Sequence, residues 1–191
     1  MSDATNDQPG TGAPAQGQQG PVAPITILAQ YTKDLSFESP KAPASLAAAA
    51  QRPPQVEINV DVQARDMQNE VYEVVLRIVA TARPAPAEGQ APTEEQKETV
   101  FLLDLSYAGL FRLQGLKEEM RKPVLLIEAP RLLFPFAREI MANTSRQGGF
   151  PPLLINPVDF ADLYRRQNGA QAAAQGQANG VAAANADEPV I

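Results

Sequence analysis

The chain contains no cysteine and no histidine among its 191 residues. Without cysteine there is no disulfide framework and no thiol nucleophile, and without histidine there is no Ser–His pair. Zinc and iron sites built from His or Cys ligands are excluded for the same reason. Carboxylates alone can still catalyse, and Asp34, Glu38 and Asp104 are the residues that such an enzyme would use. The composition nevertheless favours a protein that is not an enzyme and that uses neither a metal nor another cofactor.

Long apolar runs are lacking as well. No stretch of about eighteen apolar residues is present to span a bilayer, and the N-terminus does not have the basic and apolar parts of a signal peptide. A basic excess is also missing, because the chain carries 22 acidic and 16 basic residues, for a net charge of −6. We therefore expect a cytoplasmic protein without direct membrane insertion, and no nucleic acid among its partners.

Both ends of the chain are poor in residues that a core can bury. Residues 1–24 consist mostly of Gly, Gln, Pro, Ala and Asp, and residues 167–191 of Ala, Gln, Gly and Asn. Such compositions are typical of disordered segments. The sequence predicts a disordered N-terminal tail over 1–24, one folded domain over 25–166 and a flexible C-terminal tail over 167–191.

The first half of the domain has the alternating pattern of β-strands. Four strands are predicted, over residues 25–38, 56–62, 71–83 and 98–107. The connector over 40–54 is too long for a hairpin, so it should cross over the sheet or run along its edge. A short turn over 66–70 favours an antiparallel pair, and residues 84–97 are expected to form a flexible hairpin loop. Residues 108–115 should then turn the chain into a helical half.

Carboxylates lie on one face of each of two predicted strands. Asp34 and Glu38 alternate with apolar residues and so share a face of the first strand. Leu102 and Asp104 share a face of the fourth strand, which combines a large apolar side chain with a carboxylate. Two interpretations stay open, an ordinary solvated face of the sheet and a docking surface for a partner.

The second half is predicted to be helical, with helices over 117–128, 130–143 and 159–166. The stripe of the middle helix comprises Leu133, Phe136, Ala137, Ile140 and Met141. Leu132 and Phe134 lie off this stripe, so the helix needs cover on more than one side. It is either a core helix or a helix shared between subunits. We expect Pro135 to separate a short lead-in from the long packed segment, and Gly148-Gly149 to end the helix.

Strands followed by helices predict an α+β fold, with a four-stranded antiparallel sheet, a long helix and a short C-terminal helix. A sheet has two faces, and so few helices cannot cover all of its apolar surface. Oligomerisation is the simplest way to cover the remainder.

Five segments of the domain together resemble the SecB family of protein-export chaperones. They are residues 31–40, 71–77, 101–104, 133–139 and 156–160. These segments occur in the family's order and near its spacing, and they span most of residues 25–166. The resemblance implies a cytoplasmic homotetramer, a dimer of dimers, that binds unfolded precursor proteins without ATP and delivers them to SecA.

The resemblance also implies roles for individual residues. The SecA-docking residues would be Asp34, Glu38, Leu102 and Asp104. The client groove would be lined by Phe37, Leu46, Phe160 and Tyr164. The oligomer interface would involve Leu103, Leu105, Tyr107, Phe136 and Ile140. The alternative from another class is an oligomeric structural adaptor that does not bind unfolded clients.

Overall fold

The computed structural model describes residues 24–85 and 98–169. The predictions for the two tails and for the loop over 84–97 therefore lie almost entirely outside the described residues. The elements in chain order are β1 (Ile25–Glu38), α1 (Ala44–Gln51), β2 (Gln55–Asp66), β3 (Val71–Arg83), β4 (Phe101–Leu113), α2 (Glu118–Pro123), a π-helical turn η2 (Val124–Glu128) and α3 (Ala129–Gln147). A last helix begins at Phe160 and continues through residue 169.

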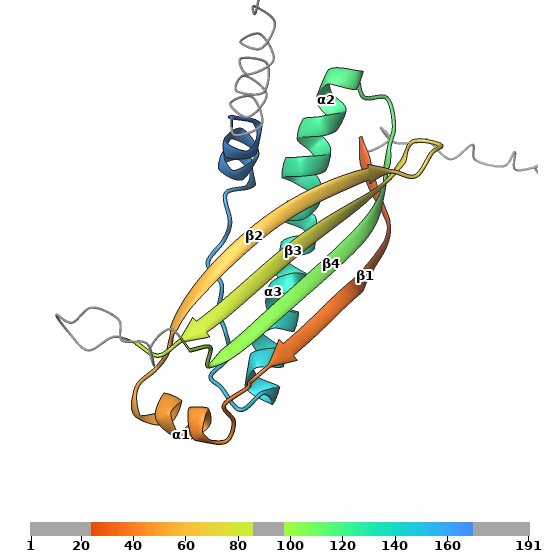
Figure 1. Ribbon diagram of the computed structural model, residues 1–191. Coiled ribbons are helices and arrows are strands. Elements are labelled where there is room, and N and C mark those ends of the chain that lie inside the picture. The colour runs from red at the N-terminus through yellow and green to blue at the C-terminus, as the bar shows by residue number, and fades with distance from the viewer. Residues whose placement is uncertain (1–23, 86–97, 170–191) are drawn as a thin grey trace, which may run out of the picture.

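The four strands form one antiparallel sheet in the order β1-β4-β3-β2. The connector that contains α1 carries the chain around one end of the sheet, from the β1 edge to the β2 edge (Figure 1). The predicted α+β fold and the predicted crossover are both confirmed. This order leaves β1 and β2 as the two edge strands.

The two faces of the sheet differ sharply. The helices lie on one side, which we call the inner face, and the other side, the outer face, is left open by the described residues (Figure 1). Side chains alternate between the faces along each strand. Leu76 and Ile78 of β3 and Leu103 and Leu105 of β4 point inward and are fully buried. The core therefore lies between the two central strands and the long helix.

The fourth strand is longer than predicted, because it continues through residues 108–113. Gly109 was interpreted as part of a turn, but it lies within the strand on the inner face. A Cβ there would come within 2.9 Å of Leu133 on α3 and 2.8 Å of Phe111. The glycine allows the helix to approach the sheet closely, so its role is packing rather than chain reversal.

The long helix also differs from the prediction at its prolines. The chain is helical without a break from Glu118 to Gln147, and it runs straight through Pro135. Pro135 lies on the exposed side of α3, where water can solvate the carbonyl that loses its hydrogen bond. The irregular turn follows Pro123 instead, where the chain forms the π-helical turn η2. The predicted break at Pro135 is therefore wrong.

The α3 helix is covered on two sides by its own chain. Leu133, Ala137 and Met141 are fully buried against the sheet. Phe134 is buried on a second side by Phe160 of the last helix, at a ring separation of 6.0 Å. Leu132 and Phe136 stay exposed. The apolar surface that remains for a second subunit is thus narrower than the sequence pattern indicated.

The last helix is positioned at both of its ends. The backbone N–H groups of Ala161 and Asp162 donate to Asp159 Oδ1 at 3.0 Å, so Asp159 caps the N-terminus. These two hydrogen bonds hold the pKa of Asp159 below its usual value, and the bond from Asp162 has the larger effect. Gln167 then donates to Asp61 Oδ1 of β2 at 3.0 Å. The helix continues past residue 166, where the tail was expected to begin.

Candidate docking and client-binding surfaces

The predicted SecA-docking residues lie together on the outer face. β1 pairs with β4 so that Glu38 is opposite Leu102 and Asp34 is opposite Ser106. Asp104 lies between these two positions, opposite Ser36. Neighbouring strands are about 4.8 Å apart, so the four side chains form one continuous patch. We call the residues Asp34, Glu38, Leu102 and Asp104 the acidic strip.

A guanidinium that the sequence analysis did not assign to this site lies beside the acidic strip. Arg77 of β3 donates from Nε and Nη2 to the two carboxylate oxygens of Asp104, at 3.0 and 2.5 Å. These bonds, followed by the charges of Asp104, Asp61 and Asp34, raise the pKa of Arg77 further above its ordinary value. Asp104 keeps only 20% of its side chain exposed, against 54% for Arg77. Alternation along β3 puts Arg77 on the outer face, and the pairing of β3 with β4 brings it next to Asp104.

An exposed apolar surface lies on the opposite side of the molecule, along β1 and α3. Phe136 stacks on Tyr107 of β4 at a centroid distance of 6.3 Å and is 47% exposed. The Tyr107 hydroxyl lies 3.3 Å from Gln30 Oε1. Ile27 and Leu35 of β1 pair with inward-facing residues of β4 and are also exposed.

The predicted interface residues separate into two groups. Tyr107, Phe136 and the half-buried Ile140 lie at or near this apolar surface. Leu103 and Leu105 have no exposed surface in the single chain, since they are packed under the helix. Their assignment to the side that supports tetramer assembly stays a prediction. They can support an interface only by holding α3 in place.

The predicted groove residues are not brought together. Phe37 packs with Phe101 and Phe150 at one end of the sheet, at ring distances of 5.8 and 6.3 Å. Leu46 of α1 lies next to Gly149 at the same end. Phe160, by contrast, is only 1% exposed and belongs to the core of the single chain. Its place in a client groove stays a prediction.

The last helix lies far from α1 along the β2 side (Figure 1). Tyr164 is half-buried on that helix. The four residues were grouped by resemblance, whereas the 151–159 segment separates the last helix from the Phe37 cluster.

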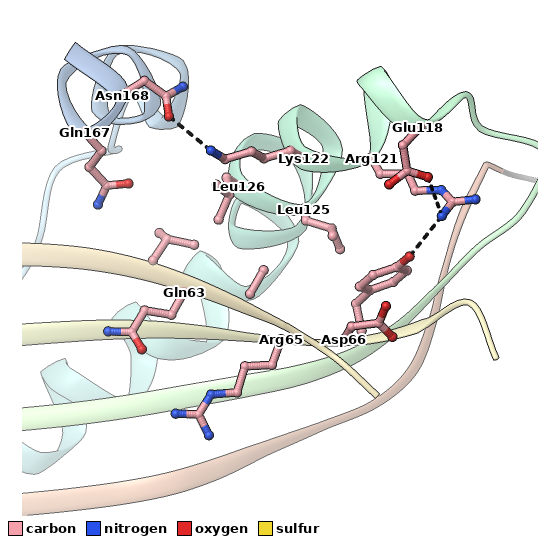
Figure 2. A pocket seen from close by; sticks show the side chains of 13 residues that line it. Gln63, Arg65, Asp66, Glu118, Arg121, Lys122, Leu125, Leu126, Gln167 and Asn168 are labelled. Atoms are coloured by element: carbon pink, nitrogen blue, oxygen red, sulfur yellow. Dashed lines mark hydrogen bonds and ion pairs between the residues drawn. The ribbon is translucent and has the colours of Figure 1, made fainter. Parts of the chain in front are cut away.

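A cavity of about 570 Å³ that the sequence analysis missed lies between the end of β2, the α2–η2 helix and the last helix. Figure 2 shows Leu125 and Leu126 of η2 facing the strands, with Gln63 and Arg65 on β2. Arg121 bridges Glu118 at 2.7 Å and the Tyr72 hydroxyl at 3.4 Å. The lining combines the apolar side chains of Leu125 and Leu126 with charged and amide side chains such as Lys122 and Gln167.

A second cavity, of about 490 Å³, lies between α1 and the strand ends near Pro54, Pro84 and Val100. On the helix side it is lined by Ser45, Ala48, Ala49 and Gln51. The two cavities flank opposite ends of β2.

Comparison with known proteins identifies the family. A family model described as preprotein translocase subunit SecB matches residues 17–171. The chain belongs to the SecB family. The chain is 53% identical over 148 residues to the protein-export protein SecB of Acidiphilium cryptum, which covers 75% of this chain and 89% of that protein. It is 49% identical over 162 residues to the SecB of Bradyrhizobium sp., which covers 85% of this chain and 93% of that protein.

A solved structure with the same fold is a SecB-like chaperone of Mycobacterium tuberculosis, in complex with a peptide from the HigA1 antitoxin. It aligns with a TM-score of 0.53 at 13% identity and covers 70% of this chain and 90% of that one. The resemblance to SecB is thereby confirmed, and the chain is a member of a family of protein-export chaperones. Among the described residues, none of the helices is both long and apolar enough to cross a bilayer.

Proposed function

We propose that this SecB-family chain is an ATP-independent chaperone of the cytoplasm, which holds unfolded precursor proteins and delivers them to SecA. The observation that carries the proposal is the acidic strip. Its three carboxylates and one leucine lie on adjacent strands of an open sheet face, with nothing described above them. A face of this kind suits a small, basic partner segment, because complementary charge guides association while the leucine provides apolar contact.

Client binding is supported by the amount of apolar surface that the single chain leaves uncovered. The two cavities offer separate sites, each lined by both apolar and polar side chains, rather than one deep pocket. An unfolded chain presents apolar side chains at irregular intervals. Several weak sites can engage one such client at once, which makes binding tight without sequence specificity.

A homotetramer built as a dimer of dimers is supported by the apolar surface around Phe136. This surface contains exposed Leu132 and Phe136 on α3 and exposed Ile27 and Leu35 on the edge strand β1. Exposed apolar surface of this kind marks an interaction site, and the free edge of a 14-residue strand is normally protected. Assembly through this side would leave the acidic strips facing outward.

The test is light scattering from a slowly folding precursor, mixed with the purified protein in the absence of nucleotide. A chaperone should suppress aggregation at a ratio of about one tetramer per client, and addition of SecA should then capture the complex. An oligomeric structural adaptor, which is the alternative function, would leave aggregation unchanged even though it binds SecA. That outcome would refute client holding.

A further inference from the structure

The outer face contains one carboxylate that is almost completely buried. Glu73 of β3 points outward, opposite Arg65 of β2 and Leu110 of β4, but it is only 7% exposed. Tyr31 Oη donates to Glu73 Oε1 at 2.5 Å, and Lys33 Nζ donates to both carboxylate oxygens, at 2.7 and 2.8 Å. We call Tyr31, Lys33 and Glu73 the clamp.

The clamp joins two strands that are not neighbours. Tyr31 and Lys33 belong to β1 and Glu73 to β3, so both donors reach across β4. The residue of β4 opposite Tyr31 is Ala108, and it is fully buried. Its small side chain leaves room for the phenol and the ammonium to pass over the strand. A larger residue at this position would separate the donors from Glu73.

The clamp acts at an irregularity in the pairing of β1 with β4. Thr32 is opposite Tyr107 and Asp34 is opposite Ser106, so Lys33 is an extra residue with no partner of its own. This is the arrangement of a β-bulge. A shift of pairing by one residue moves every following side chain to the other face of a sheet. The bulge at Lys33 therefore decides that Asp34 and Glu38 point outward.

From this geometry we infer that Glu73 is a positioning residue for SecA docking: it holds Lys33 in the bulge and thereby fixes the register that presents Asp34 and Glu38 beside Asp104. The inference rests on the proposed function of the acidic strip. Glu73 does not touch the docked partner, because Tyr31 and Lys33 cover it. Its effect passes through the residue immediately before Asp34.

The direct test replaces Glu73 with glutamine in the full chain. Glu73→Gln keeps the size of the side chain but removes the charge that binds Lys33. We expect the Kd for purified SecA to rise about fivefold to tenfold, which is within the range for coupled neighbouring residues. Hydrogen exchange of the backbone at residues 32–36 should accelerate, while tetramer mass and client binding stay unchanged. The matched control is Glu57→Gln, an exposed outer-face glutamate of β2 that pairs with Arg83 instead.

Two further variants separate positioning from general destabilisation. Exchange of the charges, Lys33→Glu with Glu73→Lys, restores an ion pair and should recover most of the affinity. The effects of Glu73→Gln and Asp34→Asn should be less than additive, because both act on the same contact. Full additivity, or unchanged affinity and exchange in Glu73→Gln, would overturn the inference. If Glu73→Gln does not assemble, Tyr31→Phe is the second variant, because it removes one hydroxyl only. It should weaken SecA binding in the same direction but by less. Unchanged SecA binding in Tyr31→Phe would count equally against the clamp.

The failure of the proposed function is recognisable separately. If Asp34→Asn leaves SecA binding unchanged in the otherwise unaltered protein, the acidic strip is not the docking site. Hydrogen exchange then still reports whether Glu73 holds the bulge. If Asp34→Asn weakens binding and Glu73→Gln does not, the docking site stands and the positioning role is refuted.

Discussion

Reversal of the charge at Asp104 should weaken SecA docking strongly while the tetramer stays assembled. The acidic strip and its neighbour Arg77 together hold three carboxylates and one guanidinium. Asp104→Lys leaves two carboxylates beside two cationic groups, one guanidinium and one ammonium, so the net local charge rises from −2 to zero. Loss of one charge at a docking contact, with a repulsive charge in its place, should weaken SecA binding about tenfold to hundredfold.

The effect on the fold should be much smaller. The Arg77–Asp104 pair is hydrogen-bonded at 3.0 and 2.5 Å, but it lies on the open face of the sheet and its guanidinium is solvated. Exposed pairs of this kind contribute little to stability. We expect the Tm of the variant to fall by no more than about 4 °C, the shift typical of a small change in a domain of this size.

Titration calorimetry against SecA at two salt concentrations measures the first effect, and sedimentation measures the tetramer. Binding by the unaltered protein should weaken as salt rises, whereas the residual binding of Asp104→Lys should change little. Glu57→Lys is the matched control, because Glu57 has the same charge, lies on the same face and is also paired with an arginine. Equal weakening by both variants would show that net charge, rather than the strip, governs docking. Dissociation of the Asp104→Lys tetramer would make Asp104 a structural residue.

Three further predictions follow from other parts of the molecule. Phe136→Asp and Tyr107→Arg should each yield dimers in sedimentation. Phe136→Asp is the more direct test, because Phe136 is exposed in the single chain. An unchanged tetramer in that variant would contradict the interface. Gly109→Ala should lower the free energy of unfolding by about 1–3 kcal/mol in denaturant titrations, because the added Cβ would lie only 2.9 Å from the Leu133 side chain. An unchanged free energy of unfolding would show that α3 can move away from the sheet. The hydrogen bonds from Lys33 and Tyr31 hold the pKa of Glu73 below its ordinary value. The stability that Glu73 contributes is therefore complete above about pH 4.3, the pKa of an unfolded Glu, and is lost as the pH falls through the lower folded pKa. Acid titration of Glu73→Gln should lack this loss, and identical acid profiles would refute it.

Much of the outer face could be predicted from local patterns. The alternation over residues 25–38 and 98–107 placed Asp34 and Glu38 on one face and Leu102 with Asp104 on another, and both assignments agree with the observed register. That prediction succeeds because the strand repeat of two residues is a local property of the backbone. The same patterns did not indicate which strands are neighbours. The place of Arg77 beside Asp104 therefore depends on the pairing of β3 with β4, which the sequence did not indicate.

The errors also have physical causes. Gly109 and Pro135 are typical of turns and breaks, yet one lies in a strand and the other within a helix. A glycine can serve close packing as well as a turn, and a proline is tolerated where water solvates the freed carbonyl. The burial of Phe160 against Phe134 was likewise not indicated by any local pattern. In each case the outcome depends on whether a segment distant in the sequence packs against that residue.

The sequence by itself determined the class of protein. The lack of cysteine and histidine removed most chemistry of catalysis and metal binding, and the strand and helix periods indicated an α+β domain with an exposed acidic face. Tertiary structure alone decided how the faces are assembled. The register that points Asp34 outward depends on the contact of Lys33 with Glu73 across β4, and these two residues are 40 positions apart in the chain. Such contacts require the strand order β1-β4-β3-β2, which no local pattern specifies, because each local pattern is compatible with several pairings.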